Sequence, residues 1–243
     1  LVLWGVPSAL LTSHITKISS DVFRVCESQE DVATMNIVGS LADQSVLENM
    51  IEASKPGSLV GHYLVSTPFR YPPLQYGSRF GGTFEPSLFY GSQSVEGCFT
   101  ETAYYRFLFF SAYASANVVK NGYTSFSFKA VSEFSIDLTQ DPFQAFAKDL
   151  LSPSNYGVTQ ELGSEIRSAG VKLIRYQSAR SIKPNVNIAL FDRSPVITEP
   201  SLMRQWFCCT RKDSVEFLAQ DRKGRFSFAI SDFLVGGVLP LPA

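Results

Sequence analysis

The sequence predicts a single α+β domain in which packed helices cover a mixed or antiparallel sheet. Two patterns predict this class. Residues 123–138 alternate apolar and polar side chains, which is typical of a long strand with one buried face. Residues 29–53 and 92–115 instead repeat apolar side chains at helical spacing. No internal repeat, low-complexity tract or linker divides the chain, so helices and strands are expected to share one core.

The composition agrees with a domain of this kind and excludes some classes of partner. Of the 243 residues, 45% are hydrophobic and 18% are charged, which is ample material for a core. The net charge is -1 and the basic residues are scattered, so a general attraction for nucleic acid is not expected. The apolar runs are too short to cross a bilayer, and no membrane contact is expected.

The N-terminal part is predicted to be mainly helical. Residues 1–20 show no clear pattern, and a short strand is expected from Asp21. A helix is predicted from Gln29 to Ala53, ending at the breakers Pro56 and Gly57, and a strand follows over 59–66. We therefore expect residues 1–66 to pack, as a mainly helical part, on a core formed by residues 67–243 within one structural domain.

The rest of the chain alternates helical and strand patterns. The long strand over 123–138 is expected to bury one face, made of Phe126, Phe128, Ala130, Phe134, Ile136 and Leu138. A hairpin turn is predicted at 221–224. The other predicted elements are a strand over 87–90, helices over 92–115, 141–151 and 159–169, and strands over 171–176, 188–191, 205–210, 214–219 and 225–230.

The cysteines and histidines predict neither a metal site nor a disulfide framework. The four cysteines form no CxxC pair, and only two histidines occur. This usage predicts four free thiols in a reducing, cytosolic compartment. It also argues against a structural zinc site and a histidine-dependent catalytic triad.

The densest mixture of Gly, Pro, aromatic and charged residues lies between residues 67 and 110. A proline-stiffened loop leads to Arg79, which is surrounded by glycines; Tyr90 ends an apolar strand, and Glu101 lies in a mostly apolar helix. A guanidinium on a glycine-rich loop suits a phosphate or carboxylate, and a buried glutamate needs a partner or a function. The chemistry alone fits equally well a surface arginine, a core tyrosine and a solvated glutamate.

These residues carry a family resemblance. The strings GSRF, FYGS and TETAYYR resemble the core of the RES domain family, named for its Arg, Glu and Ser. On this resemblance Arg79, Tyr90 and Glu101 occupy the positions of the family's arginine, tyrosine and glutamate. The family's serine precedes an asparagine-containing strand, and the matching string is QSARSIKPNVNIALF. Ser178 is the matching serine, with Ser181 as the alternative.

The resemblance implies a fold similar to the ADP-ribosyltransferases of the diphtheria-toxin kind. It implies NAD as a substrate, no metal, and a role as the toxin of a bacterial toxin–antitoxin pair, held inactive by an Xre-type antitoxin in the cytoplasm. Some members degrade NAD as glycohydrolases or phosphorylases, while others transfer ADP-ribose to a protein. A non-catalytic NAD-binding protein is a third alternative. The sequence leaves open a homodimer and delivery into another cell.

The chemistry of the matching residues agrees with NAD cleavage. Glu101 is expected to stabilise the positive charge that develops on the ribose when the nicotinamide bond breaks. Arg79 is expected to hold the pyrophosphate, with Arg70 next in line. Tyr90 is expected to stack on nicotinamide, and Ser178 to hydrogen-bond its amide or the ribose. The dinucleotide fingerprint GxGxxG is absent, which predicts that NAD is consumed and not held for hydride transfer.

Overall fold

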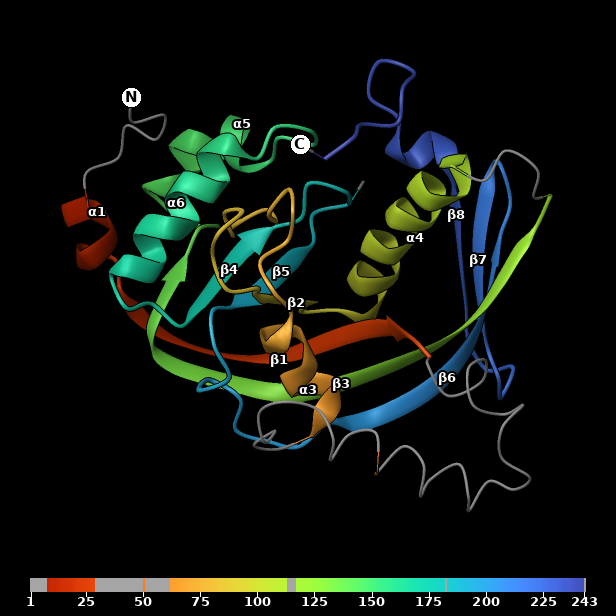
Figure 1. Cartoon of the computed structure of the whole chain (residues 1–243), viewed down its shortest axis with the longest axis horizontal. Helices are drawn as coiled ribbons and strands as arrows, with labels where there is room; N and C mark the ends of the chain where they lie inside the picture. The colour runs from red at the N-terminus through yellow and green to blue at the C-terminus, as the bar shows by residue number, and fades with distance from the viewer. Residues whose placement is uncertain (1–7, 29–49, 51–61, 113–116, 182, 243) are drawn as a thin grey trace.

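The fold is built on one eight-stranded mixed sheet (Figure 1). The structure is a computed structural model, and it describes residues 8–28, 50, 62–112, 117–181 and 183–242. The strands lie in the order β1-β2-β5-β4-β3-β6-β7-β8, and only β3 and β4 run parallel. Their bounds are β1 (Thr16–Glu27), β2 (Phe89–Ser92), β3 (Val119–Asp137), β4 (Leu173–Gln177), β5 (Val186–Leu190), β6 (Ser201–Thr210), β7 (Ser214–Ala219) and β8 (Arg225–Ala229).

The sheet closes partly on itself. Besides its contact with β2, strand β1 pairs with β3 along almost its whole length. Strands β1, β2, β5, β4 and β3 therefore form a closed circuit of pairings, and β6, β7 and β8 extend it from β3. The predicted α+β class with a mixed sheet is confirmed.

Helices cover the sheet in two separate groups. In Figure 1, α4 lies against β6, β7 and β8 at one end of the sheet, and α1, α5 and α6 gather at the other. Each group has its own core, in which Phe99 and Trp206 pack near α4, and Leu150 and Ile166 pack near α5 and α6. The helices and 3-10 turns are α1 (Ser8–Ser13), α3 (Tyr63–Ser66), η1 (Thr67–Arg70), α4 (Val95–Ala112), η2 (Phe143–Phe146), α5 (Ala147–Leu150), α6 (Gly157–Ser168) and η3 (Ile230–Phe233).

The long strand β3 is found where it was predicted, but its burial pattern differs. Phe134 was expected in the core and is 57% exposed. The pairing with β1 becomes irregular there, since Thr16 faces Ser135 and Ile18 faces Ser132, and this shift changes which side chains point inward. Ser125, on the opposite face of β3, is also buried, and its hydroxyl accepts a hydrogen bond from Trp206 Nε1 at 2.9 Å.

The N-terminal elements also differ from the prediction. Residues 63–66 form the helix α3 and not the end of a strand, because the His62 side chain accepts a hydrogen bond from the Leu64 backbone and caps it. Strand β1 starts at Thr16, earlier than predicted. The predicted helix over 29–53 lies, except for Met50, outside the described residues. Because β1 belongs to the sheet, the described part of residues 1–66 shares the core of the remainder.

Candidate active site

Glu101 lies on α4 and is held by two neutral donors, one just after β4 and one on β5. Ser178 follows β4, and its Oγ donates to Glu101 Oε1 at 2.6 Å. Asn187 lies on β5, and its Nδ2 donates to the same oxygen at 2.8 Å. Both donors are buried, and no hydrogen bond from a described residue reaches the second oxygen, Oε2. The carboxylate is therefore fixed by one oxygen and presents the other.

The pairing of β4 with β5 brings these donors together. Tyr176 faces Asn187 across the pair, and the Ser178 backbone donates to the carbonyl of Asn185. The Asn185 side chain in turn binds Ser92, Ser94 and Asn187, which ties the start of α4 to the start of β5.

The start of α4 approaches β5 so closely that only glycine fits there. A Cβ at Gly97 would lie 2.2 Å from Asn185 Nδ2 and 2.4 Å from Ser92 Oγ. Any larger residue would push α4, and Glu101 with it, away from the two donors. The position of the carboxylate therefore depends on the close contact of Gly97 with the Asn185 and Ser92 side chains as well as on its own hydrogen bonds.

Arg180 is a buried cation that the sequence did not single out. Its guanidinium lies 3.7 Å from the centre of the Tyr104 ring, and its Nη2 donates to the Tyr156 hydroxyl at 2.8 Å. Its backbone amide also donates to Ser178 Oγ at 3.1 Å. Ser178 thus accepts from Arg180 and donates to Glu101, so the segment after β4 is linked to the carboxylate.

Arg79 projects from a tight loop onto Tyr156. Gly77 has a φ of +68°, and Ser78 and Gly81 close the loop by a bridge. A Cβ at Gly77 would lie 2.4 Å from the Gly81 carbonyl oxygen, so glycine is required there. The Arg79 guanidinium lies 4.4 Å from the centre of the Tyr156 ring.

The Arg79 guanidinium is anchored through one nitrogen only. Its Nη1 donates to the carbonyls of Leu150 and Ser152, each at 3.1 Å. Among the described residues no carboxylate lies within salt-bridge distance of it. The positive charge is therefore not neutralised by a described residue, and an anionic ligand would be attracted to it.

Tyr90 supports the Arg79 loop. Its hydroxyl bonds Ser78 Oγ at 2.8 Å and accepts from the Phe80 backbone at 3.0 Å. Burial raises the pKa of Tyr90 to about 12, and the two hydrogen bonds oppose this shift. The hydroxyl is thus engaged by the protein, and the expected stacking on nicotinamide would involve the ring alone.

The charges of Glu101 and Arg79 both affect the pKa of one buried tyrosine, Tyr176. Burial raises the pKa of Tyr176 well above its usual value; the charge of Glu101 raises it further, while Arg79 and a hydrogen bond with Asn187 lower it. Glu101 and Arg79 therefore act on the same phenol. Burial likewise raises the pKa of Tyr104 to about 12, with Arg180 opposing the shift and Glu101 adding to it.

The two alternative residues lie in different surroundings. The hydroxyl of Ser181 is buried and makes no hydrogen bond with a described residue, whereas Ser178 binds Glu101 directly. Arg70 ends η1 and donates to Thr67 Oγ1 at 3.3 Å. The geometry thus joins Ser178, and not Ser181, to the carboxylate.

Sequence reasoning missed three residues of this cluster: Tyr156, Arg180 and Asn187. An amide inside the apolar run 186–190 was the one available signal, because a buried polar side chain needs partners. Arg180 and Tyr156 lie in segments without periodicity, and nothing in the sequence indicated that they meet.

Metal and thiol chemistry have no visible centre in the described part of the chain. No three His, Cys, Asp or Glu side chains there lie close enough together to hold a metal ion. All four cysteines carry free thiols, as predicted, and burial raises the pKa of Cys98 to about 12 and that of Cys208 to about 11. Of the described helices, none is long and apolar enough to cross a membrane.

The family model that matches this chain covers the residues of the candidate site. A family model described as the RES domain matches residues 56–208, which include Arg79, Tyr90, Glu101, Ser178 and Asn187. A search of curated proteins finds no significant match. Among solved structures, a chain in the crystal structure of the M. tuberculosis MbcT–MbcA toxin–antitoxin complex matches with a TM-score of 0.47 and 12% identity, over 79% of this chain and 90% of that one.

Proposed function

The chain belongs to the RES domain family, and on that premise we propose that it cleaves NAD at the bond between nicotinamide and ribose. One observation carries the proposal. The carboxylate of Glu101 is fixed through Oε1 by Ser178 and Asn187 and leaves Oε2 open, while two cations, Arg79 and Arg180, both contact Tyr156. A carboxylate and a cation held in this way suit a positively charged sugar and a pyrophosphate.

The reaction needs little chemistry from the protein beyond electrostatics. The C1′–N bond breaks, its electron pair leaves with nicotinamide, and the pyridinium nitrogen becomes neutral. The ribose is left with oxocarbenium character, as in glycoside hydrolysis. Oε2 of Glu101 stabilises this charge, and water then adds to C1′ and gives up one proton. Arg79 holds the pyrophosphate, and Ser178 keeps the carboxylate in place.

Incubating the purified protein with NAD tests the reaction. Free nicotinamide with ADP-ribose means hydrolysis, and a phosphorylated ADP-ribose formed only with added phosphate means phosphorolysis. A labelled protein acceptor means ADP-ribosyl transfer. Unchanged NAD would show a non-catalytic binding protein and would overturn the proposal.

The biological role that we propose is that of a toxin controlled by an antitoxin. The family resemblance implies an Xre-type partner in the bacterial cytoplasm, and the four free thiols agree with a reducing compartment. The proline-rich segment 69–76 offers a docking rim near Arg79, because Tyr71 is 50% exposed and Tyr76 is 75% exposed. Co-expression with the neighbouring gene should restore growth and suppress NAD loss. Rapid NAD loss by a protein that is harmless in cells would contradict this model.

A further inference from the structure

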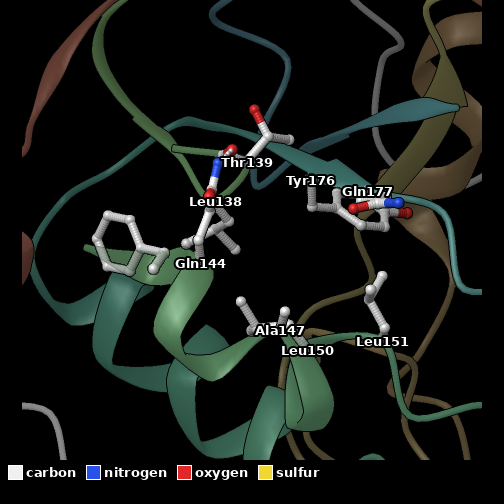
Figure 2. A pocket seen from close by; sticks show the side chains of 9 residues that line it. Leu138, Thr139, Gln144, Ala147, Leu150, Leu151, Tyr176 and Gln177 are labelled. Atoms are coloured by element: carbon white, nitrogen blue, oxygen red, sulfur yellow. Dashed lines mark hydrogen bonds between the residues drawn. The ribbon is translucent and has the colours of Figure 1, made fainter. Parts of the chain in front are cut away.

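A pocket of about 300 Å³ opens beside the candidate site (Figure 2). It lies where β3 and β4 end and where η2 and α5 pass over them. In Figure 2, Ala147 and Leu150 of α5 lie on one side, and Leu138 and Tyr176 lie on the other. The lining residues are Leu138, Thr139, Phe143, Gln144, Ala147, Leu150, Leu151, Tyr176 and Gln177.

The walls of this pocket suit a flat, uncharged ring. Most lining side chains are aliphatic or aromatic, and none is charged. Apolar walls with a few placed polar groups are typical of small-molecule sites. A volume of about 300 Å³ is at the lower end of the range for such sites, so the pocket fits part of a dinucleotide and not the whole.

The polar lining groups are mainly side-chain amides. Gln144 Nε2 donates to the Thr139 carbonyl at 2.9 Å, which uses one of its two amide hydrogens. The second hydrogen and Oε1 are left over, and the exposed Gln177 offers a further amide. A glutamine amide presents a donor next to an acceptor, which matches the N6 and N7 edge of adenine.

Two contacts connect the pocket to the charged groups. Leu150 lines the pocket, and its carbonyl accepts a hydrogen bond from Arg79. Tyr176 also lines it and lies opposite Asn187 in the β4–β5 pair, and Asn187 donates to Glu101. The pocket therefore adjoins the Arg79 cation through one wall residue and the Glu101 carboxylate through another. NAD needs these three neighbours for its adenine ring, its pyrophosphate and its nicotinamide ribose.

We propose that this pocket binds the adenine ring of NAD. The proposal rests on the proposed function, because it takes the nicotinamide ribose to lie at Glu101. It divides recognition between two places, with the adenosine half held beside α5 and the reacting half held beside α4.

Filling the pocket tests the proposal. Ala147→Leu adds bulk to a half-buried lining residue, and Ala145→Leu makes the same change at an exposed position that does not line the pocket. Both are made in the full-length Glu101→Gln protein, and calorimetry measures binding of AMP and of nicotinamide mononucleotide. We expect Ala147→Leu to weaken AMP binding about tenfold and to leave nicotinamide mononucleotide within about twofold. Ala145→Leu should change neither.

Each other result overturns the assignment. No AMP binding by the parent protein, or AMP binding that Ala147→Leu leaves intact, removes adenine from the pocket. Weaker nicotinamide mononucleotide binding with intact AMP binding would place the nicotinamide half there instead. Gln177→Leu provides a second variant and should weaken AMP binding several-fold. AMP binding that responds to Ala147→Leu, in a protein that never consumes NAD, would uphold the pocket and refute the cleavage reaction.

Discussion

Glu101 and Arg106, two of the three charged side chains of helix α4, lie in contrasting surroundings. Arg106 is buried and binds Asn121 Oδ1 at 2.5 Å and Thr210 Oγ1 at 3.2 Å, with the carboxylate of Glu27 at 4.0 Å. Glu101 has two neutral donors, and no described cation lies within salt-bridge distance of it.

The partners of a charged side chain, and not its residue type, separate the compensated Arg106 from Glu101, for which we propose a functional role. Arg106 has its charge compensated and its donors directed at protein atoms, as a buried ion requires. Glu101 keeps an open oxygen and an uncompensated charge, which is costly unless a ligand uses it. The two residues are five positions apart, a spacing that places them on different sides of the helix, so they face different neighbours.

The largest effect is expected from removing the open charge. Glu101→Gln is nearly isosteric and should lower the rate of NAD loss by about 10²–10³ while the melting temperature changes little, because a transition-state contact is lost. Release of nicotinamide from the purified variant measures it. Near-normal turnover in the folded variant would show that Glu101 is a structural charge like Arg106.

The opposite result is expected for Arg106, five positions further along α4. Arg106→Met should lower the free energy of unfolding by about 2 kcal/mol, because Asn121 and Thr210 lose their buried partner. The NAD turnover of the folded protein should not change. Urea unfolding followed by circular dichroism measures the first quantity, and a loss of turnover at unchanged stability would remove the distinction between the two charges.

A substitution at a partner of Glu101 sharpens the comparison. Asn187→Asp removes a donor and adds a like charge beside Glu101, so the apparent pKa of the carboxylate pair should rise. We expect about tenfold slower NAD loss at neutral pH. The acid limb of the pH–rate profile should move to higher pH, because the reactive form is then lost earlier as pH falls.

The matched control for that substitution lies near Arg106. Asn121→Asp also places a carboxylate beside α4, but next to the Arg106 cation. It should leave the pH–rate profile unchanged. An identical shift in both variants would show that the effect on Asn187 is a general consequence of added charge.

The smallest effect is expected at Arg79, which also has no carboxylate partner among the described residues. Arg79→Lys keeps the positive charge but loses the planar guanidinium that stacks on Tyr156 and offers a fork of donors to a pyrophosphate. The KM for NAD should rise about fivefold with little change in kcat, since a ground-state contact is weakened. An unchanged KM would move the pyrophosphate contact elsewhere, with Arg70 next to be tested.

The fold was largely predictable because its strongest patterns are local. The alternation in β3 and the strand and turn pattern of β7 and β8 predicted those elements within a few residues. One of the two failures has a non-local cause, and the other has a local cause that the strand pattern did not reveal. Phe134 is exposed because the pairing of β3 with β1 shifts, and residues 63–66 are helical because His62 caps them.

The candidate site was predictable in part for the same reason. Arg79, Tyr90 and Glu101 lie within one segment with a recognisable pattern. The donors of Glu101 come from 77 and 86 positions further along the chain, and only the pairing of β4 with β5 brings them back. Asn187 and Arg180 therefore could not be assigned before the strand order was known.

The wide separation of these partners along the chain has a consequence for synthesis. Strand β1 cannot pair with β3 until β3 has been synthesised, since Val22 pairs with Phe128. Glu101 cannot accept its hydrogen bond from Asn187 until Asn187 has been synthesised. Ribosomes extend a chain by roughly 5–20 residues per second, so the 86 positions between Glu101 and Asn187 take several seconds to make. Pairings between such distant segments also form slowly. The proposed site thus cannot be complete until most of the chain has been produced.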